Sequence, residues 1–335
     1  MDTKKRIQNI FDGVFSEGAR KIEISDETTA EDIEGWSSLK HFKFIAGIEK
    51  EFGIGFTAAE VRKFRAMGDF IAAVRNRRNP GKNVLYFLPY SGASKVTFKD
   101  WAPAFAPEIE FKALDYAGHG NRRGEGYYSS VSEACADIYN RIKDDQVIKD
   151  SRDIKDGKRP KDRYYLAGHC LGGILAYEVY YRILEKKKFG LPEGIFISGQ
   201  GAPDRMRGEK LSVMENRELL KYLHSLGAVD EGMLDEELYG FVEDFVLAPV
   251  KADSKIYEDY VLKAGREPVE SSVYVMYGRD DQTYPADEMG GWSRFASRPV
   301  RYRCYEAGHY FINSLTSRYI EDIKKAVAEN EGLVR

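Results

Sequence analysis

The segment Gly168 to Gly173 (GHCLGG) constrains the fold of this chain more than any other feature. It places Cys170 two residues after one glycine and two residues before another. This spacing is typical of a nucleophile elbow, a sharp strand-to-helix turn whose flanking residues must be almost free of side chain. Residues 163–167 (RYYLA) predict the strand and residues 174–184 (ILAYEVYYRIL) the helix. We therefore expect an exposed thiol here; the alternative is an ordinary buried cysteine in a glycine-rich turn.

Two candidate partners for a reactive thiol follow later in the chain. Val273 to Tyr277 (VYVMY) predicts a strand that leads to Asp280 and Asp281, and Val300 to Tyr305 (VRYRCY) predicts a strand that leads to His309. The order of nucleophile, acid and histidine resembles that of the α/β-hydrolases. Asp281 is the expected partner of His309, Asp280 is its competitor, and either could instead be a solvated turn residue.

Composition indicates one catalytic domain and a second, smaller domain. The chain has 335 residues, 43% of them hydrophobic, which exceeds a usual single domain and supplies a sizeable core. Its three cysteines form neither a disulfide framework nor a pair of zinc ligands, so we expect a reducing compartment and no metal. The N-terminus lacks a signal peptide and no segment is long enough to span a bilayer, which predicts a cytoplasmic protein. The net charge of −3 gives no reason to expect nucleic acid or a membrane as partner.

A polar stretch, RNRRNPGKN, predicts a boundary between two domains. Before it, apolar residues at helical spacing predict a small all-α bundle. The predicted helices span residues 4–15, 38–52 and 67–74. The predicted domains are residues 1–75, a linker at 76–83, and residues 84–335.

The first domain carries a recognisable pattern around its second helix. Glu34 to His41 (EGWSSLKH) and Ile48 to Ile54 (IEKEFGI) resemble the acyl and peptidyl carrier proteins around their modification site. In that family a serine at the start of the second helix receives a 4'-phosphopantetheine arm from a phosphopantetheinyl transferase, and the matching residue is Ser38. Ser37 stands where the family has aspartate, and the helix is less acidic than usual. The alternative is that Ser37 or Ser38 only caps the helix.

The second domain contains two segments that also resemble a known family. Leu85 to Ser94 (LYFLPYSGAS) and Leu114 to Arg122 (LDYAGHGNR) are similar to the first strand, the oxyanion loop and the next segment of type II thioesterases. These enzymes accompany polyketide and nonribosomal peptide synthetases, and the resemblance covers nearly the whole domain. The family usually has His where Tyr90 stands and Ser where Cys170 stands. The resemblance implies an α/β-hydrolase fold with a lid.

The residues themselves predict the same architecture, because strand patterns alternate with helical patterns, as in a mostly parallel sheet. The strands are expected near Val84, Phe111, Tyr164, Ile195, Val273 and Arg301. The pattern of residues 213–264 is mostly helical, with interruptions near Gly227 and Pro249, within a segment of about 205–265. The resemblance implies that they form a lid over an acyl pocket, and plain packing on the sheet is the alternative. The mixed-charge stretch 141–163 is expected to be a solvated insertion.

These features predict a thioesterase that cleaves acyl or peptidyl groups from phosphopantetheine thioesters on carrier proteins or synthetase modules, in editing or product release. Cys170 would attack the thioester carbonyl, and His309 would take up the thiol proton or pair with the thiolate. Asp281 would orient His309. The backbone N–H groups of Ser91 and Leu171 would hold the oxyanion.

A cysteine nucleophile leaves the outcome of the reaction open. Since a thiolate exchanges one thioester for another, acylation is nearly balanced and deacylation decides the product. Water gives hydrolysis, whereas an amine or alcohol gives acyl transfer or cyclising release. A hypothesis from another class is a non-catalytic carrier or docking module, which the presence of all three triad residue types opposes. His169, beside the nucleophile, is expected to point away from the site and pack structurally.

Overall fold

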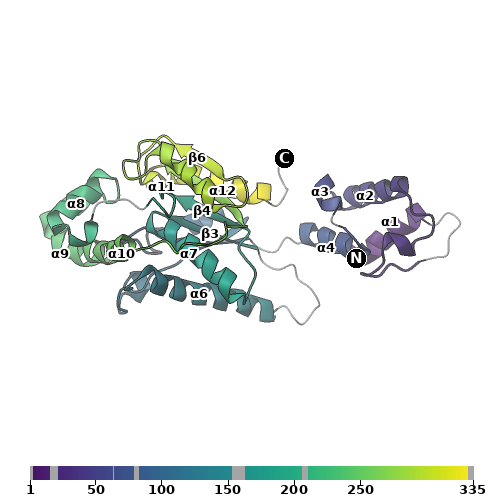
Figure 1. The fold of residues 1–335 in the computed structure, drawn as a ribbon, viewed down its shortest axis with the longest axis horizontal. Coiled ribbons are helices and arrows are strands. Elements are labelled where there is room, and N and C mark those ends of the chain that lie inside the picture. The colour runs from purple at the N-terminus through teal and green to yellow at the C-terminus, as the bar shows by residue number, and fades with distance from the viewer. Residues whose placement is uncertain are drawn as a thin grey trace. The chain divides into compact units, whose positions relative to one another are not determined.

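The computed structural model describes residues 3–15, 22–62, 64–78, 83–152, 163–205 and 210–330. The chain divides into two compact units, one within residues 1–81 and one that contains the described residues from 83 onward (Figure 1). Residues 79–82 of the predicted linker and residues 206–209 of the predicted lid lie outside the described residues. Within the described ranges, every helix is too short or too polar to cross a membrane.

The described part of the first unit is helical. It contains α1 (Thr3–Phe15), a 3-10 turn (Ala30–Asp32), α2 (Ser38–Phe52), α3 (Ala58–Val61) and α4 (Met67–Arg78). The apolar faces of the three longer helices meet in one core, which includes Ile7, Phe11, Phe44, Ile48 and Ile71. The first two agree with the predicted helices, whereas the third continues past residue 74 to Arg78, so residues 76–78 of the predicted linker are helical. The four-residue α3 was not predicted because it is too short to show a helical period.

The second unit is built on a six-stranded sheet in the order β2-β1-β3-β4-β5-β6. The strands are β1 (Asn83–Leu88), β2 (Ile109–Ala113), β3 (Arg163–His169), β4 (Gly194–Ser198), β5 (Ser272–Gly278) and β6 (Arg301–Tyr305). All neighbouring strands are parallel, so the predicted parallel sheet is confirmed. Parallel strands end at the same edge, and the loops that follow β1, β3, β5 and β6 therefore meet there.

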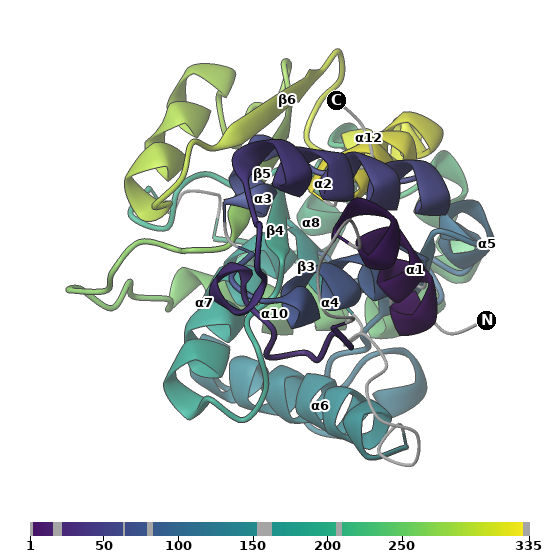
Figure 2. The ribbon, with the colours of Figure 1, turned by 90° about the vertical axis from the view of Figure 1, so that its right-hand side faces the viewer.

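Helices cover both faces of this sheet (Figure 2). Alternate residues of a strand point to opposite faces. Val84, Tyr86 and Leu88 of β1 pack with α6 (Val131–Arg152) and α7 (Leu171–Lys186). On the other face, Leu85 and Phe87 pack with α5 (Trp101–Phe105), α11 (Phe311–Ser314) and α12 (Thr316–Asn330). The sheet is thus buried on both sides, as its apolar strands require.

The prediction of a solvated insertion at 141–163 is wrong for its first part. Residues 141–152 are the end of α6. Ile142 and Gln146 are buried, and Gln146 Nε2 donates a hydrogen bond of 2.9 Å to the Tyr86 hydroxyl. The charged residues lie on the outer face of this helix, and they made its buried residues with helical spacing hard to recognise in the sequence. Residues 153–162 of the stretch lie outside the described residues.

The predicted lid lies between β4 and β5. It contains η4 (Leu211–Val213), α8 (Asn216–Ser225), α9 (Tyr239–Val242), a π-helical turn (Glu243–Leu247) and α10 (Ala248–Glu258). Figure 1 shows α8, α9 and α10 together at one end of the second unit. They share a small core of their own that includes Leu219, Leu220, Leu247 and Val250. The interruption expected at Pro249 takes the form of the π-helical turn, because proline has no N–H for the regular helical bond.

Candidate active site

Cys170 lies at the sharp turn between β3 and α7. Its backbone adopts φ 53° and ψ −119°, which is unusual for a residue with a side chain. A Cβ atom at Gly168 would lie 1.9 Å from the Gly172 carbonyl oxygen, and one at Gly172 would lie 1.9 Å from the Leu88 carbonyl oxygen. Both glycines are therefore required by close backbone approach. Cys170 is partly exposed and lines a cavity, unlike an ordinary buried cysteine.

His309 and Asp281 form a buried pair at the same edge of the sheet. His309 follows β6, and its Nδ1 donates to Asp281 Oδ2 at 2.8 Å. The other carboxylate oxygen, Oδ1, accepts the backbone N–H groups of Thr283 at 2.8 Å and Tyr284 at 3.0 Å. Asp280, the competing candidate, is exposed. The structure thus brings Asp281, and not Asp280, to His309.

The hydrogen bonds of His309 decide its tautomer and charge. Because Nδ1 donates to Asp281, Nε2 is the ring atom left for the Cys170 thiol, which is a hydrogen-bond partner of this imidazole. Burial disfavours the cation, but the bonds to Asp281 and Cys170 outweigh it and raise the pKa of His309 to about 10. An imidazole that is hydrogen-bonded to a cysteine is the partner that activates the sulfur in Cys–His enzymes.

His169 packs beneath this pair without joining the cavity. It is fully buried, its Nδ1 lies 3.2 Å from the Ser198 hydroxyl oxygen, and its ring centroid is 5.1 Å from that of His309. Burial and the neighbouring His309 lower the pKa of His169 well below its usual range. A neutral ring in this place supports His309 by packing, as expected for a residue that points away from the site.

A cavity of about 60 Å³ opens beside the Cys170 thiol. Its walls come from the elbow, the loop after β1, the loops after β5 and β6, and the lid. The lining residues are Ser91, Cys170, Leu211, Tyr222, Leu223, Leu226, Val250, Ser254, Tyr257, Glu258, Thr283, Tyr284, His309 and Tyr310. Helices α8 and α10 of the predicted lid therefore line the cavity together with Cys170.

Several of these lining residues could not be found from the sequence. Tyr222, Ser254 and Tyr284 carry no motif, and their helices or loops only meet the thiol in three dimensions. Tyr310 had one available signal, its position directly after His309. Conversely, Phe241 and Phe245 of the lid are exposed and stacked on each other at 4.3 Å. Apolar residues of the lid therefore divide between the cavity, the core of the lid and its surface.

The two predicted oxyanion donors belong to the elbow and to the loop after β1. Leu171 is the first residue of α7, so its N–H has no acceptor within the helix. Ser91 lies in the loop after β1 and lines the cavity with Cys170. The next two amides of this loop are occupied: Gly92 N–H donates to Asp253 Oδ2 at 2.8 Å, and Ala93 N–H donates to the Tyr90 carbonyl at 3.0 Å.

In the first unit, the two adjacent serines have different roles. Ser37 is the N-cap of α2, and its hydroxyl accepts the Lys40 N–H at 3.3 Å. Ser38 is the first residue of α2 and is exposed. The capping alternative therefore applies to Ser37, whereas the Ser38 hydroxyl is accessible at the helix N-terminus.

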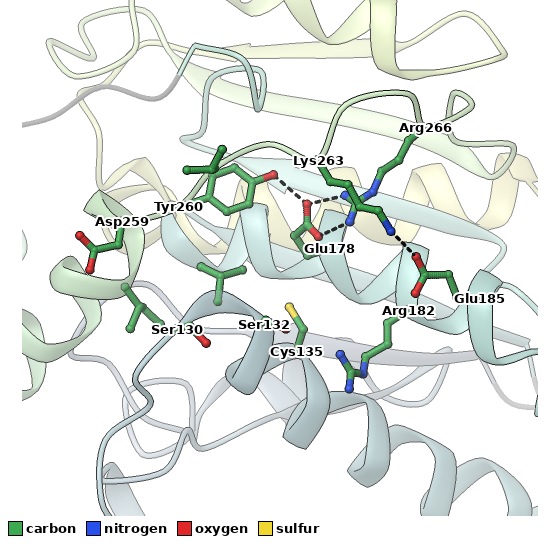
Figure 3. A pocket seen from close by; sticks show the side chains of 13 residues that line it. Ser130, Ser132, Cys135, Glu178, Arg182, Glu185, Asp259, Tyr260, Lys263 and Arg266 are labelled. Atoms are coloured by element: carbon green, nitrogen blue, oxygen red, sulfur yellow. Dashed lines mark hydrogen bonds and ion pairs between the residues drawn. The ribbon is translucent and has the colours of Figure 1, made fainter.

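A second cavity, of about 380 Å³, lies away from the elbow between α6, α7 and the segment after α10 (Figure 3). Its side chains largely bind one another: Arg266 forms two bonds to Glu178, of 2.6 and 2.8 Å, and the Tyr260 hydroxyl adds a third of 2.7 Å. Cys135 also lines this cavity, and burial raises the pKa of its sulfur, which therefore stays a thiol. Among the described residues, no histidine lines this cavity.

The comparisons with known proteins concern the second unit. The model of the family described as "Thioesterase domain" matches residues 83–327. Thioesterase PikA5 of Streptomyces venezuelae is 27% identical over 249 residues, which cover 74% of this chain and 82% of PikA5.

Solved structures show the same fold. ClbQ from the colibactin NRPS/PKS pathway superposes with a TM-score of 0.65 at 24% identity, covering 76% of this chain and 100% of that chain. The type II thioesterase BorB from the borrelidin biosynthetic cluster superposes with a TM-score of 0.61 at 22% identity, covering 75% of this chain and 94% of that one.

Proposed function

This chain belongs to the thioesterase domain family, and from that premise we propose that it hydrolyses acyl or peptidyl thioesters of phosphopantetheine on carrier proteins through Cys170, His309 and Asp281. The observation that carries the proposal is the buried His309–Asp281 pair beside a thiol on a nucleophile elbow. Similarity to PikA5, and the descriptions of ClbQ and BorB, support a place in polyketide or nonribosomal peptide synthesis, in editing or product release. A location in the cytoplasm stays a prediction.

The acylation step follows from the charges at the site. The Cys170 thiolate attacks the thioester carbonyl carbon, and a new C–S bond forms. The negative charge that develops on the carbonyl oxygen is held by the N–H groups of Ser91 and Leu171. The bond to the pantetheine sulfur then breaks, and His309 Nε2 gives its proton to the leaving thiolate. Asp281 keeps the ring oriented through Nδ1.

Deacylation reverses the role of His309. The ring, now neutral, takes a proton from water through Nε2, and the oxygen attacks the acyl carbon on Cys170. The carboxylic acid leaves, and the thiolate is restored beside the protonated imidazole. An amine or alcohol in the place of water would give acyl transfer or cyclising release by the same steps. A purely non-catalytic docking role is disfavoured by the buried pair, because burying two ionisable groups carries a desolvation cost that a docking module has no need to meet.

We also propose that Ser38 carries the 4'-phosphopantetheine arm. The residues fit this group, because Ser38 is exposed at the start of α2 while Ser37 supplies the helix cap. The Ser38 hydroxyl would be the attachment atom, and a phosphopantetheinyl transferase would be the enzyme that modifies it. When bound, the arm supplies a thiol that carries acyl groups as thioesters. Partners of the second unit would be carrier proteins or synthetase modules of this chemistry.

The test of the catalytic proposal uses the full chain and acyl-N-acetylcysteamine thioesters, with the released acid measured by chromatography. Wild type should release acid, Cys170→Ala should release none above background, and Cys170→Ser should retain a reduced rate because the oxyanion donors and His309 remain. Addition of a primary amine reports acyl transfer as an amide product. A Cys170→Ala variant as active as wild type would refute the proposal.

A further inference from the structure

A second buried pair of an imidazole and a carboxylate lies outside the candidate triad. Asp253 belongs to the lid helix α10, His119 lies just before the 3-10 turn η2 (Gly120–Arg122), and each is 3% exposed. His119 Nε2 is 3.1 Å from Asp253 Oδ2. The same oxygen accepts the Gly92 N–H at 2.8 Å. One carboxylate thus joins the lid, the segment around His119 and the loop that carries Ser91.

The contacts of His119 favour a charged ring. Its Nδ1 lies 2.9 Å from the Ala117 carbonyl oxygen, which can only accept, so Nδ1 bears a proton. A neutral ring would then turn the lone pair of Nε2 toward a carboxylate oxygen, which is repulsive. A proton on Nε2 removes the repulsion and makes the ring an imidazolium. Since the approach to Asp253 is not aligned as a hydrogen bond, the contact is an ion pair.

The surroundings of His119 hold further ionisable groups. Asp115 lies near it on the same segment, and the rings of Tyr116 and Tyr127 each have centroids 5.7 Å from the imidazole. Burial disfavours the cation, but Asp253, Ala117 and Asp115 outweigh it and raise the pKa of His119. Burial raises the pKa of Tyr116 and Tyr127, so both phenols stay neutral.

The loop after β1 packs directly on the lid helix at Gly92. This residue has φ 79°, and a Cβ atom there would lie 2.3 Å from Val250 Cγ2 of α10. Gly92 therefore lies so close to α10 that no side chain would fit between them. A displacement of α10 would break the bond from Gly92 and move the neighbouring Ser91 amide.

We propose that Asp253 and His119 are positioning residues that couple the lid helix α10 to the oxyanion loop. The ion pair holds the Asp253 carboxylate, the carboxylate holds the Gly92 amide, and the Ser91 amide is thereby held toward the carbonyl oxygen of the substrate. This inference rests on the proposed function, in which the Ser91 N–H stabilises the oxyanion. Because the pair does not touch Cys170, His309 or Asp281, it acts on transition-state stabilisation and not on the thiol.

The test compares the full-length wild type with Asp253→Asn and with Asp259→Asn, a matched control on the exposed end of α10 whose carboxylate binds Lys255. Steady-state hydrolysis of acetyl-N-acetylcysteamine is measured, together with the rate at which iodoacetamide alkylates Cys170. Asp253→Asn should lower kcat about tenfold or more, with KM and the alkylation rate within about twofold of wild type. Asp259→Asn should leave all three unchanged.

The outcomes separate this inference from the proposed function. If Asp253→Asn keeps the wild-type kcat while Cys170→Ala is inactive, the coupling is wrong and the triad stands. If Cys170→Ala is also active, the proposed function itself fails.

A second measurement does not depend on the folding of a variant at Asp253. Nitrogen-15 NMR of the imidazoles of the wild type, with His119 assigned by its loss in His119→Gln, should show both ring nitrogens protonated at pH 7.5. A neutral His119 ring overturns the ion pair and, with it, the proposal.

Discussion

Cys170 is held in a conformation that costs free energy, and its neighbours compensate for it. Among the described residues, the non-glycine residues with positive φ are Cys170 and Lys187, and the second of these merely ends a helix. A strained backbone of this kind costs on the order of 1–3 kcal/mol. The Cys170 N–H donates to the Ser198 carbonyl at 2.9 Å, and the Cys170 carbonyl accepts the Gly173 N–H at 2.9 Å. The elbow is therefore fixed from both sides.

The elbow glycines should be intolerant of even one added carbon. We expect Gly172→Ala to lower the free energy of unfolding by about 3 kcal/mol, because its Cβ would lie 1.9 Å from the Leu88 carbonyl oxygen. Urea-induced unfolding measures this change. Gly124→Ala is the matched control, since a Cβ there meets nothing within 4 Å. A Gly172→Ala protein as stable as the control would contradict the close approach.

The charge of His309 predicts how stability depends on pH. The pKa of His309 is raised to about 10 in the folded chain, against about 6.5 when unfolded. Between these values His309 holds more protons in the folded state than in the unfolded state. Its contribution to the unfolding free energy is therefore fully present below about pH 6.5 and falls as pH rises, by up to ~1.4 kcal/mol per pH unit. His119, whose pKa is also raised, acts in the same direction. Below pH 6.5 the lowered pKa of His169 makes stability fall again as pH falls.

This pH dependence is measured by denaturant unfolding from pH 5 to 9. His309→Gln should have a slope above pH 6.5 that is smaller by the contribution of one proton, whatever its absolute stability. An unchanged slope in His309→Gln would show that this residue is neutral in the folded protein.

At the level of elements, the sheet and its long helices follow from local patterns, whereas the lid does not. The strands are short apolar runs that stay buried on both faces. In the lid, helical periodicity was visible, but Leu219 packs inside the lid, Leu223 lines the cavity and Phe241 is exposed. Apolar residues with the same helical spacing therefore lie in three different environments. Only the placement of α8 and α10 over the elbow decides which residue lies in which.

The size of the cavity predicts a preference for short acyl groups. With about 60 Å³ beside the thiol, wild type should hydrolyse acetyl and propionyl thioesters with a kcat/KM at least about tenfold above that for octanoyl thioester. Leu226→Ala, which shortens a lining side chain, should reduce this ratio. Leu238→Ala, at an exposed lid position that does not line the cavity, is the control. Equal rates for acetyl and octanoyl substrates would show that the lid opens to a larger pocket.

At the level of the whole molecule, a thioesterase unit shares a chain with a small helical unit. The family model begins at residue 83, so membership of the family concerns the second unit. The first unit has its own core and presents Ser38 at an exposed helix start, beside the exposed side chains of Leu39 and Phe42. Whether this unit carries a covalently bound acyl group is therefore a separate question from catalysis and needs its own test.

Intact-protein mass spectrometry tests that role. After incubation with a phosphopantetheinyl transferase and acyl-coenzyme A, wild type and Ser37→Ala should gain the arm, since Ser37 supplies only the cap, and Ser38→Ala should not. In Cys170→Ala the acyl group should stay on the arm, whereas in wild type it should be lost. A Ser38 that never gains the arm would refute the carrier proposal and leave a thioesterase whose substrates are on other proteins.

The sequence by itself determined the features that depend on neighbours along the chain. The elbow follows from glycines two residues on either side of Cys170, the strands follow from short apolar runs, and α1, α2 and α4 follow from helical spacing. The loops after β5 and β6 were identified because a parallel sheet brings the ends of its strands to one edge. These features are local, because the side chains of a short segment limit sterically which backbone conformations it can adopt.

Only the tertiary structure decided which side chains meet. The sequence favoured Asp281 but kept Asp280 as its competitor, and packing of the loop buries Asp281 against His309 while Asp280 faces solvent. The pair of His119 and Asp253 joins segments far apart in the chain, and neither residue belongs to a motif that predicts the other. Side-chain partners of this kind depend on how loops and lid helices pack on the sheet, and that packing is a property of the whole fold.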